Sequence, residues 1–208
     1  MLLIVGIGFL ALASVAIERG IREFNVYLVS SELEKWERSN PESRESSVAI
    51  NVQRLGSLVE KYPQDTRLAF MAVKVTEWQA HAQKLSPRTQ KKSYARIESM
   101  LAGILKHRPF WGRAWSARLL NWSHLQKNWD STTDLLYSNA MAHGKWDAAS
   151  VYYLVRFTYQ NWSWIPEQQK PEIESWMDQV FSYGGPVKQY IRLNESQFPN
   201  VKIRSNAA

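Results

Sequence analysis

The side chains best suited to binding chemistry are arginines and tryptophans in the second half of this 208-residue chain. Guanidinium groups bind carboxylates and phosphates through paired N–H donors, and indole faces pack on sugar C–H groups or other apolar surfaces. The candidate binding residues are Arg108, Trp111, Arg113, Arg118, Trp162 and Trp164. These residue types predict a site for a partner protein or an acidic glycan.

Core packing is the main alternative for the tryptophans. Apolar residues at spacings of four, four, three and three occupy one helix face, and they are Trp111, Trp115, Leu119, Trp122 and Leu125. Side chains at this spacing most often pack between helices. Trp162 and Trp164 differ because they precede Pro166 in an expected loop. They are therefore the best candidates for exposed tryptophans.

Positive charge is concentrated in the same part of the chain. Residues 84–118 contain nine Lys or Arg residues against one acidic residue, Glu98, while the whole chain carries a net charge of +7. Such a segment attracts an acidic partner, an acidic glycan or anionic lipid headgroups, although a solvated helix face explains it equally well. Nucleic acid is not an expected partner, because no recognition-helix or RNP-type pattern accompanies the charge.

Catalytic and metal-binding patterns are absent from the sequence. The four histidines are scattered without a ligand spacing, and there is no cysteine, phosphate-binding glycine loop or nucleophile motif. We therefore expect a non-enzymatic protein with no catalytic residues, no cofactor and no metal site.

Capping residues and apolar periodicity divide the chain into helices. Asp65, Asp130 and Asp147 each precede an apolar run and are expected N-caps. Ser86 is expected to cap a helix that starts with proline, and Gly144 is expected to end a helix in the left-handed conformation. No run of β-branched residues lies between turn signals, so the sequence predicts an all-α fold.

The helix pattern repeats when Pro63 is aligned with Pro109, a shift of 46 residues. The apolar residues that then align are Leu55 with Leu101, Leu58 with Ile104, and Val59 with Leu105. Helix pairs of this kind bury their apolar faces by stacking. The sequence therefore predicts a tetratricopeptide-like array of antiparallel helix pairs.

The chain begins with seventeen uncharged residues that contain no proline. A helix of this length covers about 25 Å, slightly less than the ~30 Å hydrocarbon core, and Arg19 and Arg22 could snorkel. We expect an uncleaved transmembrane helix; a signal peptide cleaved near Ala16 is the alternative. The flanking arginines weakly favour a cytoplasmic location for the remainder.

The expected organisation has four parts. They are an anchor over residues 1–20, a membrane-proximal helix and linker over 21–45, a repeat-like helical domain over 46–184, and a loosely attached tail over 185–208.

Two motifs carry a resemblance to a known family. The pattern R-P-x-W-x-x-x-W occupies residues 108–115, and A-x-x-x-G-x-W occupies residues 140–146. Together with the apolar N-terminus, they resemble the VpsP-type polysaccharide biosynthesis proteins over about residues 108–164. Ala148 departs from the family pattern, in which proline is expected.

The resemblance implies a single-pass protein of the bacterial inner membrane with a periplasmic soluble domain. It further implies a non-enzymatic accessory or scaffold protein of an exopolysaccharide biosynthesis or export system, which binds a partner protein through its helical array. Direct binding of an anionic polysaccharide in transit and a general membrane-tethered assembly role remain as alternatives.

Overall fold

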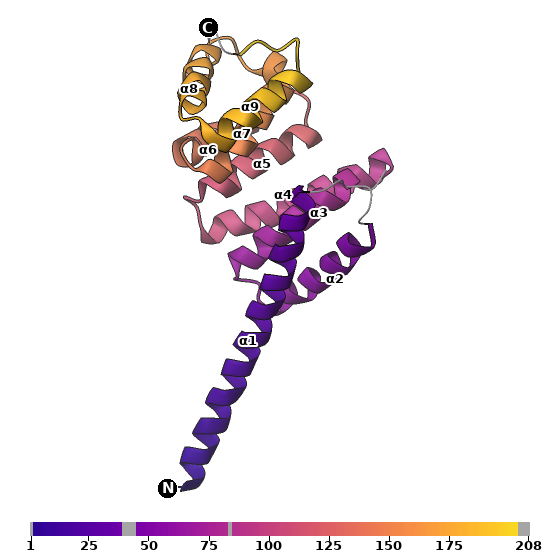
Figure 1. The fold of residues 1–208 in the computed structure, drawn as a ribbon, viewed down its shortest axis with the longest axis vertical. Helices are drawn as coiled ribbons and strands as arrows, with labels where there is room; N and C mark the ends of the chain where they lie inside the picture. Colours follow the sequence, from indigo (N-terminus) through magenta and orange to yellow (C-terminus); the bar gives the residue numbers. More distant parts are fainter. Residues whose placement is uncertain (1, 39–44, 83–84, 204–208) are drawn as a thin grey trace. The chain divides into compact units, whose positions relative to one another are not determined.

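The computed structural model describes residues 2–38, 45–82 and 85–203, with the side chains of residues 2–11, 36–38, 45–47, 49 and 81–82 left out of the description. Over these residues the chain forms nine α-helices and one 3-10 turn and contains no strand (Figure 1). The helices are α1 (Leu2–Arg38), α2 (Glu45–Lys61), α3 (Thr66–Ala82), α4 (Pro87–His107), α5 (Gly112–Leu125), α6 (Ser131–Gly144), α7 (Ala148–Asn161), α8 (Lys170–Ser182) and α9 (Gly185–Gln197), with the 3-10 turn η2 (Trp162–Trp164) after α7. The predicted all-α fold is confirmed.

The helices form two compact units, Met1–Leu85 and Ser86–Ala208. The boundary between them falls inside the single helical domain that the sequence predicted over residues 46–184. Each unit has its own apolar core, and each is described by itself below.

Helices α1, α2 and α3 build the first unit. The buried core residues are Val29, Leu33, Val48, Leu55, Leu68 and Val75. Val29 and Leu33 lie one helical turn apart on α1, so the second half of α1 packs against the α2–α3 pair. This part of α1 was predicted to be a membrane-proximal helix and linker; it is helical as far as Arg38, and Val29 and Leu33 belong to the core of the first unit.

No helix in the part of the chain that the structure describes combines the length and the apolar character needed to cross a membrane. The structure therefore lends no support to the predicted anchor over residues 1–20. The side chains of the first eleven of these residues lie outside the described ones.

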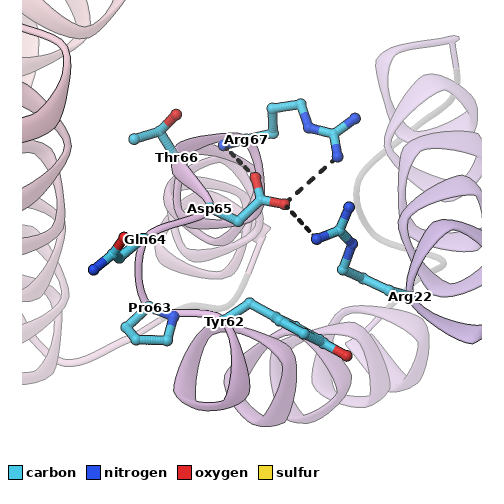
Figure 2. Close-up of a pocket in the computed structure, with 7 residues that line it drawn as sticks. All are labelled: Arg22, Tyr62, Pro63, Gln64, Asp65, Thr66 and Arg67. Carbon is cyan, nitrogen blue, oxygen red and sulfur yellow. Dashed lines mark hydrogen bonds and ion pairs between the residues drawn. The ribbon is translucent and has the colours of Figure 1, made fainter. Parts of the chain in front are cut away.

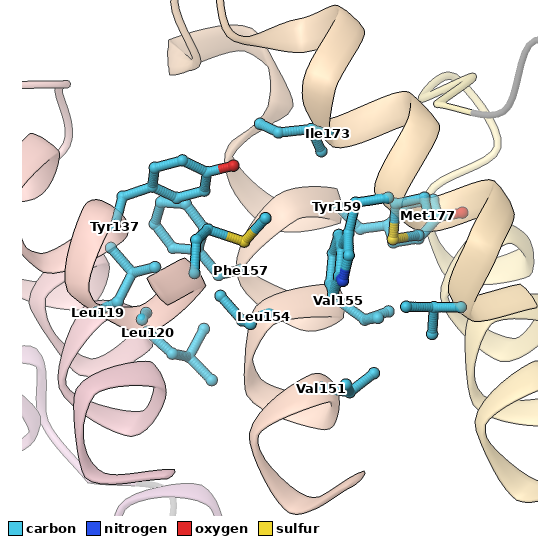
Figure 3. Packing of buried hydrophobic residues seen from close by; sticks show 14 of the residues in the cluster. Leu119, Leu120, Tyr137, Val151, Leu154, Val155, Phe157, Tyr159, Ile173 and Met177 are labelled. Atoms are coloured by element: carbon cyan, nitrogen blue, oxygen red, sulfur yellow. The ribbon is translucent and has the colours of Figure 1, made fainter. Parts of the chain in front are cut away.

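Helix α7 is the central helix of the second unit (Figure 3). Its buried apolar residues are Val151, Leu154, Val155, Phe157 and Tyr159. They pack together with leucines of α5, with Leu136 and Tyr137 of α6, and with Ile173 and Met177 of α8. The last helix, α9, adds Ile191 to the same core.

The prediction of a loosely attached tail is wrong for residues 185–203. Helix α9 occupies most of this stretch, and Ile191 and Ile203 are buried. Val187, Tyr190, Phe198 and Val201 also pack against this core while half-buried. Tertiary contacts with α7 and α8 therefore hold α9 in place.

Side-chain caps confirm the expected helix starts. Asp130, Asp147 and Ser86 each accept a hydrogen bond from the backbone N–H three residues later, at 2.7, 2.9 and 3.3 Å. Asp65 accepts the N–H two residues later at 3.0 Å. These acceptors satisfy donors that the first helical turn leaves unpaired.

We expect Asp130→Ala to destabilise the second unit by about 1 kcal/mol, because the first turn of α6 loses its cap. The N–H and hydroxyl of Thr133 hold the pKa of Asp130 below its usual value. The contribution of the carboxylate is therefore present at neutral pH and is lost as pH falls through the lowered pKa. Urea denaturation at neutral and acidic pH measures both effects.

Asp130→Asn is the control for this prediction, because asparagine keeps an acceptor at the cap without a charge. It should retain most of the stability at neutral pH. Equal destabilisation by the asparagine and alanine variants would contradict a capping role for Asp130.

Gly144 ends α6, but the predicted left-handed conformation is wrong. Among the described residues, positive φ occurs only at Gly184 and Gly185, at 73° and 61°. The close packing of neighbouring helices explains why position 144 is a glycine. A Cβ atom there would lie 2.9 Å from Ser116 Oγ and 2.9 Å from Ser150 Cβ, so Gly144 allows α5 and α7 to approach the end of α6.

Candidate functional site

The same short turn joins a helix pair in each unit. In the first unit the N–H of Asp65 donates to the carbonyl of Tyr62 at 3.0 Å. In the second unit the N–H of Trp111 donates to the carbonyl of Arg108 at 3.1 Å. The 46-residue shift that aligns Pro63 with Pro109 therefore also aligns the hydrogen bonds of the two turns.

The turns between α6 and α7 and between α8 and α9 carry the equivalent hydrogen bond. The N–H of Asp147 donates to the carbonyl of Gly144 at 3.0 Å between α6 and α7. The N–H of Gly184 donates to the carbonyl of Phe181 at 3.2 Å between α8 and α9. From Trp111 to Asp147 to Gly184, the turn recurs after 36 and then 37 residues.

Each of the three turns that join α4 to α5, α6 to α7 and α8 to α9 presents an exposed aromatic ring at its third position. The exposed fractions are 78% for Phe110, 53% for Trp146 and 73% for Tyr183. The first unit has the polar residue Gln64 at this position. We call Phe110, Trp146 and Tyr183 the aromatic turn edge.

Ring contacts connect neighbouring turns of this edge. The ring of Phe110 meets the ring of His143 edge-on at 5.4 Å between centroids, and Trp146 meets Tyr183 edge-on at 6.0 Å. Gly112 makes the first contact possible, because a Cβ atom at this position would lie 2.1 Å from the carbonyl oxygen of His143. The start of α5 therefore lies directly against the end of α6.

Two cations lie close to aromatic rings of these turns. The guanidinium of Arg108 lies 4.6 Å from the ring centroid of Trp111, and the ammonium of Lys145 lies 5.7 Å from that of Trp146. Neither cation forms an ion pair within the described residues. The exposed edge rings, with the cations Arg108 and Lys145 in the same turns, suit a partner surface that is both apolar and acidic.

The structure brings only part of the predicted binding set to this edge. Arg108 and Trp111 lie in its first turn, and the half-buried Arg113 follows on α5. Arg118 is engaged within the chain, because its Nε donates to Glu98 at 2.7 Å and its guanidinium lies over Trp115. This pairing leaves Arg118 poorly suited to bind a separate anionic ligand.

Trp162 and Trp164 lie elsewhere, at the opposite end of α7. They form the 3-10 turn η2, and both are half-buried, so the prediction that they are the best candidates for exposed aromatic residues is wrong. The buried side chain of Ile165 holds the turn against the core, and Trp162 packs there as well. The fourteen residues of α7 place them about 20 Å from the aromatic turn edge.

The sequence analysis missed Phe110, Trp146 and Tyr183. One signal could have found two of them. Phe110 directly follows Pro109, and Trp146 directly precedes the capping residue Asp147, so both stand between helices and outside any apolar face. Tyr183 carries a similar signal, because a pair of glycines follows it.

A basic face on α4 forms a second surface of the second unit. Its exposed cations are Arg88, Lys91, Lys92 and Arg96. None of them forms an ion pair within the described residues, and the one acidic residue of the segment, Glu98, is held by Arg118. The opposite side of α4 is buried through Tyr94, Ile97 and Leu101. The positive charge of this face is therefore open to solvent.

A pocket of about 630 Å³ lies in the first unit, between α1 and the turn that joins α2 to α3 (Figure 2). Its lining residues are Arg22, Tyr62, Pro63, Gln64, Asp65, Thr66 and Arg67. Arg22 and Arg67 both reach the carboxylate of Asp65, with N–O distances of 3.8 and 3.5 Å. Glu23 also binds both guanidinium groups, at 2.8 and 3.1 Å.

No family model, curated protein or solved structure matches this chain. The resemblance to VpsP-type proteins therefore stays a prediction. Within the described residues there is also no cluster of three or more side chains suited to bind a metal ion. The surfaces described above are thus the basis for assigning a function.

Acid pH is expected to loosen α1 from the α2–α3 turn. Hydrogen bonds from Arg22 and Arg67 hold the pKa of Glu23 below its usual value. The stabilisation is present above the unfolded-state pKa and is lost as pH falls through the lowered, folded-state value. Hydrogen exchange of α1 should therefore increase on acidification, and Glu23→Gln should increase it already at neutral pH.

Glu34→Gln provides the matched control, because Glu34 is an exposed glutamate of α1 that forms no ion pair within the described residues. This variant should exchange like the unmodified protein at each pH. If Glu23→Gln left the pH dependence of exchange unchanged, Glu23 would not hold α1 in place.

Proposed function

We propose that this protein is a non-enzymatic, membrane-tethered accessory protein of a bacterial exopolysaccharide biosynthesis or export system. It binds a partner protein through the aromatic turn edge. The observation that carries the proposal is the repetition of one turn with an exposed ring at the same position in α4–α5, α6–α7 and α8–α9. Aromatic residues and arginine are enriched in protein interfaces and dominate their binding energy.

Further observations support the remaining parts of the proposal. The equivalent turns and the antiparallel helix pairs of the second unit support a tetratricopeptide-like array. The uncharged run over residues 1–17 supports a tether in the bacterial inner membrane. The VpsP-type motifs support the exopolysaccharide system and a periplasmic location of the helical units. Tethering raises the effective concentration of a weakly binding module beside its membrane partner.

Crosslinking of the full chain in native membranes, followed by capture and mass spectrometry, tests the docking role. We expect one polymerase, ligation or export component at stoichiometric level, with crosslinks mapping beside Phe110, Trp146 and Tyr183. A variant with alanine at these three positions should lose the partner at least about tenfold, because each buried ring supplies more than about 1 kcal/mol.

The control variant carries alanine at Leu135 and Leu193, two similarly exposed apolar residues of the second unit outside the edge. It should retain the partner. Recovery of the protein's own chain alone, or equal loss in the control, would contradict docking through the aromatic turn edge.

The basic face of α4 favours a second candidate function, the binding of an acidic polysaccharide. A linear polyanion can follow the four cations, which span about 12 Å of helix between Arg88 and Arg96. This surface replaces Arg113 and Arg118, the residues first considered for a glycan, because Arg118 is paired with Glu98. No large apolar side chain of α4 is exposed beside Lys91, Lys92 and Arg96 to favour insertion into a bilayer instead.

Titration with an acidic polysaccharide at two salt concentrations tests this second candidate. Binding should weaken at high salt, and glutamine at Lys91, Lys92 and Arg96 should abolish it. A charge-matched control has glutamine at Lys127, Arg192 and Lys202, which are exposed cations of the second unit outside α4. Equal loss in both variants would show that net charge alone causes binding.

A further inference from the structure

The pocket of the first unit lies at a fixed distance from the apolar N-terminal run. Arg22 follows Ile17 by five residues in the continuous helix α1. Five residues advance a helix by about 7.5 Å, and each headgroup layer of a bilayer is about 5–8 Å deep. With residues 1–17 in the hydrocarbon core, the pocket lies at the depth of the lipid headgroups.

Opposite charges balance at this pocket: Arg22, Arg67 and Asp65 line it, and Glu23 pairs with both arginines from outside the lining. The two guanidinium groups, of Arg22 and Arg67, face the two carboxylates of Glu23 and Asp65 at distances between 2.8 and 3.8 Å. Figure 2 shows both guanidinium groups converging on Asp65. An anionic ligand is attracted by the two guanidinium groups and repelled by the carboxylates, and a cationic ligand the reverse. A zwitterion can place its negative group near the guanidiniums and its positive group near a carboxylate.

Hydrogen-bonding capacity remains in the pocket. The Nε atom of Arg22 is buried and has no hydrogen-bond partner within the described residues. This atom has no exposed area for a ligand to reach, so the terminal N–H groups of the two guanidiniums are the donors that face a phosphate oxygen. Gln64 and Thr66 add an amide and a hydroxyl to the lining. The ring of Tyr62, typical of the membrane interface, lies 5.4 Å from the guanidinium of Arg22.

We infer that this pocket binds the headgroup of a zwitterionic phospholipid of the ethanolamine phosphodiester class. The phosphate lies against Arg22 and Arg67, and the ammonium lies against Asp65, the carboxylate that lines the pocket. The inference rests on the membrane tether of the proposed function and involves a different surface from the aromatic turn edge. A phosphatidylglycerol headgroup has the phosphate but no cation, so it offers Asp65 no partner when the phosphate engages the arginines.

Native mass spectrometry of the full chain, released from nanodiscs of equal phosphatidylethanolamine and phosphatidylglycerol content, tests the site. We expect phosphatidylethanolamine adducts to exceed phosphatidylglycerol adducts about tenfold, and Arg67→Gln to remove this preference, because a charge-assisted hydrogen bond is lost. Arg67→Lys should retain part of the preference, since it keeps the charge without the planar fork. Arg192→Gln, an exposed arginine of α9, is the control and should change nothing.

Gln64→Leu guards against a folding defect, because Gln64 lines the pocket outside the ion pairs. It should reduce the preference while thermal unfolding stays unchanged. Equal adducts of the two lipids, or a full preference in Arg67→Gln, would overturn the headgroup site. Vesicle flotation separates the two proposals: a chain that does not float overturns the tether and this site together, whereas a floating chain without lipid preference overturns the site alone.

Discussion

Gly112→Ala should destabilise the second unit by about 3 kcal/mol or more, the upper end of the cost of overpacking. The added methyl carbon would lie 2.1 Å from the carbonyl oxygen of His143 and 2.6 Å from the Cα of Gly144. Both atoms belong to the backbone, so no side-chain rotation relieves the overlap. Helices α5 and α6 must move apart, and the contact between Phe110 and His143 is lost with them.

Urea denaturation of the full chain measures this effect, and Gly103→Ala is its control. Gly103 is an exposed glycine in the middle of α4, and a Cβ atom there meets nothing within 4 Å. Alanine at this position should stabilise the protein by about 0.5–1 kcal/mol, because glycine loses more conformational freedom in a helix. If both substitutions shifted stability in the same direction, the close approach at Gly112 would not limit the fold.

Phe157→Ala is expected to cost about 3–5 kcal/mol, the largest effect of a single side chain that we foresee. Phe157 is 1% exposed and lies on α7, the helix that the other core helices surround. Its ring is 6.3 Å from that of Trp129 and shares the core with Leu154 (Figure 3). Truncation removes this apolar surface and leaves a cavity that rigid neighbouring helices fill only in part.

Phe110→Ala removes the same atoms from an exposed position and should change stability by no more than about 0.5 kcal/mol. Thermal unfolding of both variants by circular dichroism gives the comparison. A similar loss for Phe110→Ala would mean that the aromatic turn edge is part of the core and is not a free binding surface.

Local signals explain why most of the helices could be predicted. An aspartate or serine cap, a proline at a helix start and an apolar stripe each act within a few residues, so Asp130 and Ser86 mark helix starts in sequence and structure alike. Gly144 and α9 could not be assigned in this way. The role of Gly144 depends on Ser116 and Ser150 from other helices, and α9 is held by contacts with α7.

The candidate site was predictable only in its first turn. Arg108 and Trp111 stand out as a basic and aromatic pair beside a proline. The pairing of Arg118 could not be predicted, because its partner, Glu98, lies twenty residues away on another helix. Likewise, the exposure of Trp146 and the burial of Trp162 depend on which helices surround them, and periodicity does not report this.

The recurrence of one turn after 36 and 37 residues also affects how a protein of this kind can change over time. Insertion or deletion of a whole helix pair would alter the number of presented rings and leave their mutual spacing intact. The number of rings available for binding would then change with the number of helix pairs in the chain, and the contacts made by each existing ring would stay the same. Binding of such a partner would persist after substitutions at one turn, because the rings of the remaining turns still contact it.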